Sequence, residues 1–226
     1  MRLFFMRRIW RRRRHSNMLV DLKVKEFSER LAAGVPTPGG GSASALAGCL
    51  AASLGAMVCD LTLGKPKYEA VRTEMERARE ALSGMRKDLL ARVDRDSDAY
   101  DEVARAMKFP KETPEEKRAR QEALGRANQF ATEIPVKTAE TCLAVLEQVK
   151  IVAEKGNPNA VSDAGVAAHL AHTGLAGAAL NVRINLPGIP DRERASQIEE
   201  RLAKMEAGAE RLLLETRETV ARRMKG

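Results

Sequence analysis

Three consecutive glycines, Gly39, Gly40 and Gly41, lead into the stretch that most constrains how this chain can fold. Residues 43–59 are small or apolar at nearly every position, so a helix here has no polar face to turn toward water and must be buried. Its small side chains allow neighbouring helices to come very close. We therefore predict a central buried helix that ends near Asp60, with Ser42 as its N-cap.

A second stretch, from Asn159 to about Asn185, has the same character. Ala164, Ala168, Ala171, Gly174 and Ala178 recur at spacings of three and four residues, which is the period of one helix face. Two helices that both allow close approach are expected to meet, within one subunit or across a dimer.

The rest of the sequence also favours helices. Aromatic residues make up only 4% of the chain, and the hydrophobic fraction of 44% comes mainly from Ala, Leu and Val. No strand-like alternation is present. We expect an all-α bundle, in which two long helices surround the central small-residue helices. The expected helices cover residues 19–33, 43–59, 68–107, 114–155 and 159–185, with a last one that ends near Met224.

The basic character of the chain is concentrated at its start. The net charge is +8, but residues 1–17 hold seven arginines and no acid, so the remainder is almost balanced. We expect this leader to be disordered or an artefact of the start site, with Met18 as the working initiator and residues 18–226 as one domain. Cys49, Cys59 and Cys142 lack metal-ligand spacing and fit small core residues of a reducing cytosol, so a cytoplasmic protein without a membrane span is expected.

Several polar residues fall where a plain bundle does not need them, although each group has a structural explanation. Asn157, Asn159, Ser162 and Asp163 crowd the start of the second small-residue helix, where capping accounts for one or two of them. Asn181 and Asn185 share a face near its end. Asp94, Asp96 and Asp98 lie in the first long helix, with Asp96 on a different face from the other two. His169 and His172 are three residues apart but have no third metal ligand at a suitable spacing, and no metal site is expected.

The combination of these stretches is more specific than any one of them. The segments are Pro-Thr-Pro-Gly-Gly-Gly-Ser at 36–42, Leu-Thr-Leu-Gly-Lys at 61–65, Asp96 with Ala99-Tyr100, Lys-Gly-Asn-Pro-Asn-Ala-Val-Ser-Asp at 155–163, and Asn-Val-Arg-Ile-Asn at 181–185. In order and spacing the chain from about Leu19 onward resembles the formimidoyltetrahydrofolate cyclodeaminase and methenyltetrahydrofolate cyclohydrolase family.

The resemblance implies an all-helical homodimer that acts on reduced folates, including polyglutamylated forms, without a metal or redox cofactor. Two reactions stay open. Cyclodeamination joins N10 to the formimino carbon and expels ammonia, whereas cyclohydrolysis interconverts the 5,10-methenyl and 10-formyl compounds. Both pass through a tetrahedral carbon between N5 and N10, so one site could serve either reaction.

Chemistry suggests a role for each residue in these motifs. A buried carboxylate would favour the methenyl cation and accept a proton, which points to Asp163 first and to Asp96 second. Lys65 could donate a proton to departing ammonia or contact the carboxylates of the substrate. The remaining candidates bind the substrate through backbone N–H groups, amides, a hydroxyl or a charge: Gly39, Gly40, Gly41, Ser42, Lys111, Asn157, Asn159, Ser162, Asn181 and Asn185.

This reading predicts that the glycine turn and the residues around position 160 form the walls of one pocket. The competing hypothesis is a non-catalytic helical dimer, a scaffold whose arginine arm holds nucleic acid. That scaffold would bind DNA or RNA with a strong salt dependence that residues 1–17 provide. The folate reading gives nucleic acid no role.

Overall fold

The computed structural model describes residues 18–225. Within that range all regular structure is helical, as predicted, and the arginine leader lies outside the described residues. Four 3₁₀ turns, η1 to η4, connect or precede the longer helices. The α-helices are α2 (Val24–Leu31), α3 (Gly40–Leu63), α4 (Arg72–Met107), α5 (Pro114–Lys155), α6 (Val161–Asn185) and α7 (Arg192–Arg223).

The predicted N-cap of the central helix is wrong. Helix α3 begins at Gly40, and Gly39 is its N-cap, in an extended conformation without a capping side chain. The N–H of Ala43 donates to the Gly39 carbonyl, which closes the first turn three residues earlier than expected. Ser42 therefore lies inside the helix. Thr113 is the N-cap of α5: its hydroxyl accepts from the N–H of Glu116, and the Glu116 side chain accepts from the N–H of Thr113 in return.

Three other helix starts differ from the prediction. Residues 19–33 form a short 3₁₀ turn, η1 (Leu19–Asp21), followed by α2. The helix expected from Tyr68 opens as the 3₁₀ turn η2 (Pro66–Val71). The stretch from Asn159 likewise opens as η3 (Pro158–Ala160). Proline explains the last two, since it favours the first position of a helical turn but cannot donate the N–H that an α-helix interior needs.

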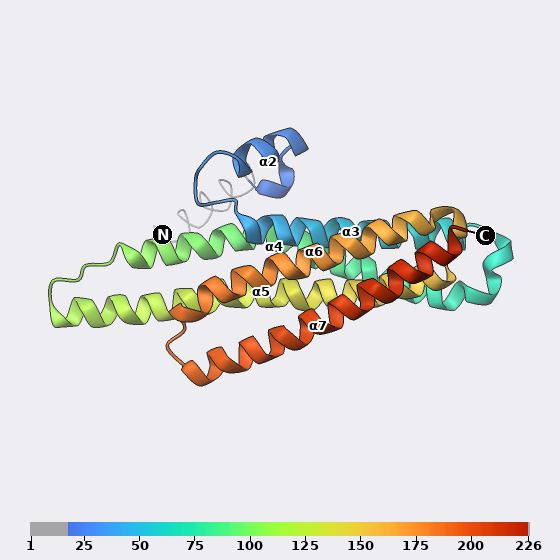
Figure 1. Ribbon diagram of the computed structural model, residues 1–226. Helices are drawn as coiled ribbons and strands as arrows, with labels where there is room; N and C mark the ends of the chain where they lie inside the picture. The colour runs from blue at the N-terminus through green and yellow to red at the C-terminus, as the bar shows by residue number, and fades with distance from the viewer. Residues whose placement is uncertain (1–17, 226) are drawn as a thin grey trace, which may run out of the picture.

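Short connections make consecutive helices from α3 to α6 antiparallel neighbours (Figure 1). The α4–α5 hairpin extends past the rest of the bundle, α2 stands apart above it, and α7 crosses α5 and α6 obliquely. As a result, the start of α3, the second half of α4, the first half of α5 and the end of α6 lie toward one end of the molecule. The end of α3, the start of α4 and the start of α6 lie toward the other.

The predicted contact between the two small-residue helices is confirmed within one subunit. A Cβ on Gly174 of α6 would lie 2.9 Å from both the Cys142 sulfur and the Ser44 carbonyl oxygen, and 3.1 Å from the Gly48 nitrogen. The backbones of α3 and α6 are thus in close contact, and the side chain of Cys142 from α5 packs against them. All three cysteines are buried and free, as expected for small core residues.

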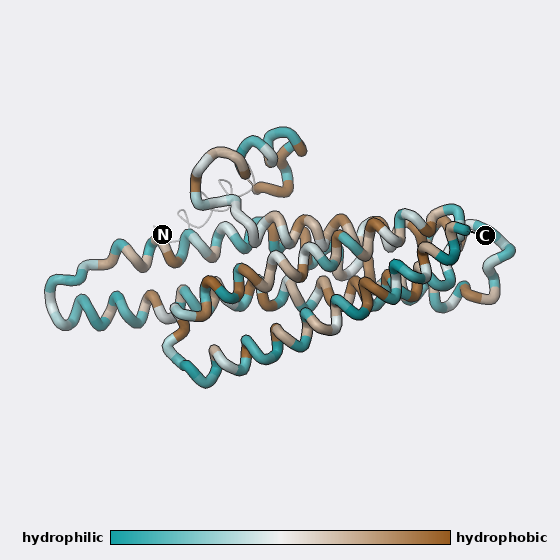
Figure 2. The backbone as a smooth tube through the Cα atoms, in the orientation of Figure 1, coloured by the Kyte–Doolittle hydropathy of each residue, from teal (hydrophilic) through white to brown (hydrophobic). Residues whose placement is uncertain are grey.

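The hydrophobic residues gather along the middle of the bundle, while the tip of the α4–α5 hairpin is mostly hydrophilic (Figure 2). Among the described helices, α3 alone is long and apolar enough to cross a membrane by length and composition. Its place between α4, α5 and α6 accounts for that apolarity, because Ala51, Ala52 and Val58 are completely buried in the shared core.

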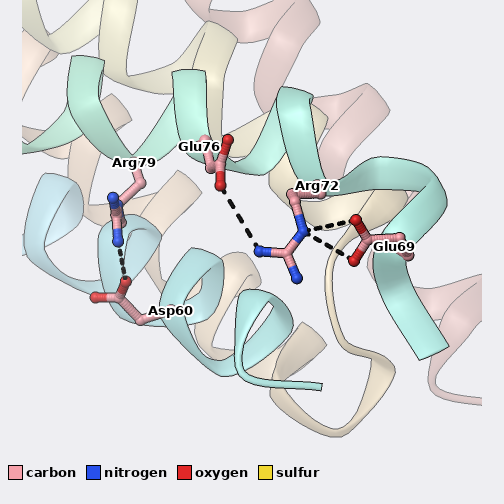
Figure 3. A network of polar contacts seen from close by, with 5 residues as sticks. All are labelled: Asp60, Glu69, Arg72, Glu76 and Arg79. Atoms are coloured by element: carbon pink, nitrogen blue, oxygen red, sulfur yellow. Dashed lines mark hydrogen bonds and ion pairs between the residues drawn. The ribbon is translucent and has the colours of Figure 1, made fainter. Parts of the chain in front are cut away.

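At the end opposite the glycines, surface ion pairs tie α4 to the segments before it (Figure 3). Arg79 lies 3.3 Å from Asp60 at the end of α3, and Arg72 contacts both Glu69 in η2 and Glu76 one turn further on. These side chains are substantially exposed, so each pair contributes little to stability, about 0–1 kcal/mol.

Candidate active site

The N-terminus of α3 is pressed against a carboxylate. Asp96 of α4 lies so close to Gly41 that a Cβ there would overlap the carboxylate. The Ser42 hydroxyl donates to the Val93 carbonyl at 2.8 Å and also lies 3.2 Å from Asp96 Oδ2. The hydroxyl of Ser97 is 3.3 Å from that of Ser42. Asp96 is thus held at the positive end of the α3 dipole, where an anion is favoured.

Two opposing effects act on the acidity of Asp96. Burial raises its pKa above the ordinary value for an aspartate, because desolvation penalises the charged form. Hydrogen bonds from the side chain and backbone of Ser42 lower it, but they do not cancel the effect of burial. The result is a partly buried carboxylate that holds a proton more readily than a surface aspartate does.

Helix α6 brings two amides to the same end of the bundle. The amide of Asn181 lies over Gly40, where a Cβ would be 3.3 Å from Nδ2, and it donates to the Gly177 carbonyl at 2.8 Å. Asn185, one turn later, donates to the Ala131 carbonyl of α5 at 2.9 Å. We call the set formed by these residues the glycine-end cluster. Its members are Gly39, Gly40, Gly41, Ser42, Asp96, Asn181 and Asn185.

The other predicted site residues lie at the far end of α3, around Asn157. Asn157 is buried, and its backbone N–H donates to the Thr62 hydroxyl at 2.8 Å. Its amide donates to the Leu61 carbonyl, and its oxygen accepts from the Tyr68 hydroxyl and the Asn159 N–H. The polar groups of Asn157 are therefore largely taken up in joining α3, η2 and η3.

Its neighbours are more accessible. Asn159 and Ser162 are exposed, whereas Lys65 and Asp163 are half-buried. We call this second set the Asn-Pro-Asn cluster; it comprises Lys65, Asn157, Asn159, Ser162 and Asp163. The last candidate, Lys111, is exposed in the turn of the α4–α5 hairpin and belongs to neither cluster.

The two clusters do not form one pocket within a subunit, so this part of the prediction is wrong for the single chain. Asp96 contacts Ser42, and Asn157 contacts Thr62. At 1.5 Å per residue these two points lie about 30 Å apart along α3. The antiparallel topology is the cause, since it sends the start of α3 and the start of α6 to opposite ends of the bundle.

Sequence reasoning assigned no role to three residues that shape these clusters. Asp94 accepts from the N–H groups of Leu19 at 2.6 Å and Val20 at 3.4 Å, and so fixes the N-terminal segment beside the start of α3. Ser97 lies beside the Ser42 hydroxyl, and Tyr68 binds Asn157. The alternation of Asp94 and Asp96 was the available signal for Asp94. It places carboxylates on two faces of α4, whereas a helix packed in a bundle normally exposes only one face to solvent.

No group of three or more His, Cys, Asp or Glu side chains within residues 18–225 is arranged to hold a metal ion. His172 instead contacts Glu210 of α7 at 2.9 Å. Burial raises the pKa of the Cys59 and Cys142 thiols to about 12, so neither is a ready thiolate nucleophile or ligand. Of the described ionisable residues near the α3 N-terminus, Asp96 is the best placed to exchange a proton.

The sequence model of one family, formiminotransferase-cyclodeaminase, matches residues 23–204. The chain belongs to this family. The match includes both clusters and all the predicted site residues, and it excludes the arginine leader. The scaffold hypothesis receives no support from the comparisons.

Individual members of the formiminotransferase-cyclodeaminase family agree over most of the chain. A methenyltetrahydrofolate cyclohydrolase from Methylorubrum extorquens is 43% identical over 190 residues, which cover 82% of this chain and 90% of that protein. The formimidoyltransferase-cyclodeaminase of Rattus norvegicus is 34% identical over 173 residues, or 76% of this chain. The aligned part is only 32% of the rat protein, so this chain corresponds to about a third of it.

The fold agrees as well. The crystal structure of a formiminotetrahydrofolate cyclodeaminase from Thermotoga maritima superposes with a TM-score of 0.79 at 31% sequence identity. The superposition covers 89% of this chain and 96% of the other. The predicted family and the all-α fold class are thus confirmed.

Proposed function

We propose that this chain is an enzyme of folate one-carbon metabolism, and that it makes or breaks the bonds between N5, N10 and their bridging carbon at the glycine-end cluster. The named relatives support the substrate class, since they are a cyclohydrolase and cyclodeaminases of tetrahydrofolate compounds. The observation that carries the location is the partly buried Asp96 carboxylate against the bare backbone of Gly41. No metal or redox cofactor has a role in the proposal.

Asp96 acts as proton acceptor in either reaction. In cyclodeamination N10 attacks the formimino carbon, Asp96 takes the N10 proton and passes it to the former formimino nitrogen, and the C–N bond then breaks with loss of ammonia. In cyclohydrolysis a water attacks the methenyl carbon and Asp96 takes one of its protons. N5 receives that proton as its bond to the carbon breaks, and the remaining hydroxyl proton is released as the formyl C=O forms. A raised pKa makes Asp96 a stronger base than an ordinary carboxylate, and its charge also stabilises the methenyl cation.

The substrate contacts follow from the same geometry. The first N–H groups of α3 point out of the helix at Gly40 and Gly41, where they can donate to the carbonyl of a pterin ring. Asn181 and Asn185 supply amide groups at its edge. Asp163 and Lys65 stay candidate catalytic groups, but within one subunit their Asn-Pro-Asn cluster lies about 30 Å from the glycine-end cluster along α3. They can act at the glycine-end cluster only if another subunit brings them there.

A second copy of the chain supplies them. Exposed apolar side chains occur along α3 and α6 between the two clusters, and we call this set the apolar stripe; it includes Leu180, which is 67% exposed, and Ile184, which is 78% exposed. Val166 on the stripe is one turn from Ser162 and Asp163. The stripe is completed by Leu50, Met57 and Leu61 of α3.

We therefore infer a homodimer in which this stripe packs on its own copy about a two-fold axis perpendicular to α3. That axis makes the two α3 helices antiparallel, so the glycine-end cluster of each subunit meets the Asn-Pro-Asn cluster of its partner. A two-fold axis parallel to the helices would instead bring the two glycine-end clusters together and the two Asn-Pro-Asn clusters together, and neither site would be complete. The single pocket expected from sequence is then formed between subunits.

Mixed dimers test this arrangement. Asp96→Asn and Asp163→Asn should each reduce turnover by about 10²–10⁴-fold. When both variants are co-expressed, half of the dimers are mixed, and each mixed dimer holds one intact site, so activity should return to about a quarter of the wild-type level. Absence of recovery in verified mixed dimers, or normal turnover by Asp163→Asn alone, would refute the shared site.

The reaction itself is tested with residues 18–226 and with the full chain. Both should convert 5-formimidoyltetrahydrofolate or 5,10-methenyltetrahydrofolate, followed by absorbance, with similar rates. The substrate that is turned over identifies the reaction as cyclodeamination or cyclohydrolysis. Failure to convert either compound would contradict the enzyme proposal.

A further inference from the structure

Ser42 is completely buried, and its hydroxyl lies within reach of three oxygen atoms. The Val93 carbonyl oxygen is 2.8 Å away, Asp96 Oδ2 is 3.2 Å away and the Ser97 hydroxyl is 3.3 Å away. A serine hydroxyl has one proton to donate, so it can serve only one of these oxygens at a time. The shortest contact gives that proton to the Val93 carbonyl, which leaves the Ser42 oxygen free to accept from the other two groups.

The contact between Asp96 and Ser42 therefore depends on the protonation state of the carboxyl group. An ionised Asp96 can only accept, so it competes with the Val93 carbonyl for the Ser42 proton. A protonated Asp96 can donate to the Ser42 oxygen. Burial raises the pKa of Asp96, which makes the protonated form accessible during turnover. A proton on Asp96 thus has an acceptor on the buried side of the site.

Ser97 links this buried pair to the surface. It follows Asp96 directly on α4 and is only half-buried, whereas Ser42 is completely buried. Taken in the order Asp96, Ser42, Ser97, the side-chain oxygens form a continuous row with steps of 3.2 Å and 3.3 Å. The row runs from the candidate proton acceptor to a hydroxyl that solvent can reach.

The two candidate reactions place different demands on Asp96. In cyclodeamination the proton that Asp96 takes from N10 leaves with ammonia, so nothing remains on the carboxylate. In cyclohydrolysis the attacking water brings two protons, and N5 takes only one of them. The second must leave as H⁺, since it carries away the positive charge of the methenyl compound. A folate bound over Gly40 and Gly41 would restrict the direct access of Asp96 to water, so this proton needs another way out.

We propose that Ser42 and Ser97 form a proton relay through which Asp96 returns this second proton to solvent during cyclohydrolysis. The inference rests on the proposed function. Asp96 is ionised again once N5 has received the first proton, and it then accepts the remaining hydroxyl proton as the formyl C=O forms. The Ser42 hydroxyl turns from the Val93 carbonyl toward Ser97.

The transfer through the relay is balanced at each oxygen. The proton of Asp96 passes to the Ser42 oxygen, the Ser42 proton passes to Ser97, and the Ser97 proton passes to water. Each serine gives up one proton as it receives one, so both hydroxyls are unchanged and Asp96 is ionised for the next turnover. Rotation of the two hydroxyls restores the starting arrangement.

The variant Ser97→Ala tests the relay, because it removes the outer hydroxyl and leaves Asp96 and Ser42 in place. With 5,10-methenyltetrahydrofolate, kcat should fall by about tenfold, which is less than the 10²–10⁴-fold loss expected when an acid or base itself is removed. The value of kcat/KM should stay nearly unchanged, since Asp96 is reset after the chemical step. The solvent deuterium isotope effect on kcat should increase, and a high concentration of imidazole should restore kcat by taking the proton directly.

Two matched variants serve as controls. Ser97→Thr keeps a hydroxyl at the same position and should retain the wild-type kcat. Ser53→Ala removes a hydroxyl that donates to the Cys49 carbonyl within α3 at 2.8 Å, and it should leave kcat and the isotope effect unchanged. A third comparison uses the other substrate: Ser97→Ala should convert 5-formimidoyltetrahydrofolate at the wild-type rate, because that reaction leaves no proton on Asp96.

The outcomes separate the relay from the reaction. If the wild type hydrolyses the methenyl compound and Ser97→Ala keeps the same kcat, the relay is wrong and the proposed function stands. A loss that imidazole does not restore, or an equal loss in kcat and kcat/KM, would also overturn the relay, since it would show that Asp96 had been displaced. Cyclodeamination without any cyclohydrolysis in the wild type would overturn the relay and uphold the folate enzyme. If the wild type converts neither compound, the proposed function fails and the relay fails with it.

Discussion

Gly41 and Asp96 fit against each other with no room for a side chain between them, since a Cβ on Gly41 would overlap the carboxylate. The third glycine of the run is therefore explained by contact with a neighbouring helix. It lets the first turn of α3 present its N–H groups to a carboxylate that α4 carries. Both helices must keep their present axial positions for this to happen.

Gly41→Ala should displace Asp96 and lower turnover by about 10²-fold, since errors near 1 Å in the position of a reacting group have that effect. Overpacking should also reduce the free energy of unfolding by about 1–3 kcal/mol. The control is Gly84→Ala in α4, where nothing lies within 4 Å of the added Cβ. That exposed helical site should gain about 0.5–1 kcal/mol without loss of activity. Equal effects of the two changes on kcat would contradict the role assigned to Gly41.

Asp96→Asn should separate activity from stability. Turnover should fall by about 10²–10⁴-fold. Burial raises the folded-state pKa of Asp96, so its ionised form costs stability at neutral pH, and that cost is absent below the unfolded value of about 3.9. Urea unfolding should show the variant to be at least as stable as the wild type at pH 7, with the advantage shrinking as the pH falls toward 4.

The pH dependence of kcat/KM provides a second measurement on Asp96. The carboxylate must be ionised to accept a proton, so activity should fall on the acid side as Asp96 becomes protonated. Because its pKa is raised, the fall should begin at a higher pH than an ordinary aspartate would give. An acid limb centred near 3.9 in the wild type would remove Asp96 from the role of base.

Asp94→Ala should release the N-terminal segment, because the carboxylate receives the N–H groups of Leu19 and Val20. Hydrogen exchange in residues 19–31 should become faster while the α5–α6 core keeps its protection. Asp98→Ala, on the exposed face one turn later, is the matched control. If both variants leave exchange in residues 19–31 unchanged, the bonds to Asp94 do not hold the segment.

Asn157→Ala should destabilise the end of the bundle opposite the glycines. The change removes three hydrogen bonds of the side chain and deprives the Leu61 carbonyl, the Tyr68 hydroxyl and the Asn159 N–H of their partner. We expect a loss of about 1–3 kcal/mol in the free energy of unfolding. The exposed neighbour Asn159→Ala should lose less. A midpoint in urea that is the same for the two variants would show that Asn157 is not the structural joint inferred from its contacts.

Local features of the fold could be predicted from sequence because their causes are local. Thr113 before Pro114 defines a helix start through backbone chemistry alone, and the glycine and alanine spacing defines the faces of α3 and α6. Ser42 misled because serine is a good N-cap by composition, whereas here its hydroxyl is used by the Val93 carbonyl of another helix. No sequence pattern reports such a long-range partner.

The site was harder to predict for a reason that topology explains. Asp163 had more polar neighbours in sequence than Asp96, and so it ranked first. In the fold, Asn157 uses its polar groups for hydrogen bonds to other parts of the bundle, such as Thr62. Asp96, in contrast, contacts Gly41 and Ser42, which are distant in sequence. Short connections between α3, α4, α5 and α6 already imply that consecutive helices are antiparallel. That rule would have placed the two clusters at opposite ends of one chain.

The length of α3 sets the distance between the two shared sites in the proposed dimer. Each shared site joins the start of one copy of this helix to the finish of the other, so the number of residues between Gly39 and Lys65 works as a ruler for both sites at once. Inserting one helical turn into α3 would shift the partner's groups by about 5.4 Å at each site. No other residues would take their place. Hence the loops between helices can change in length, whereas this interval cannot change unless both subunits change register together.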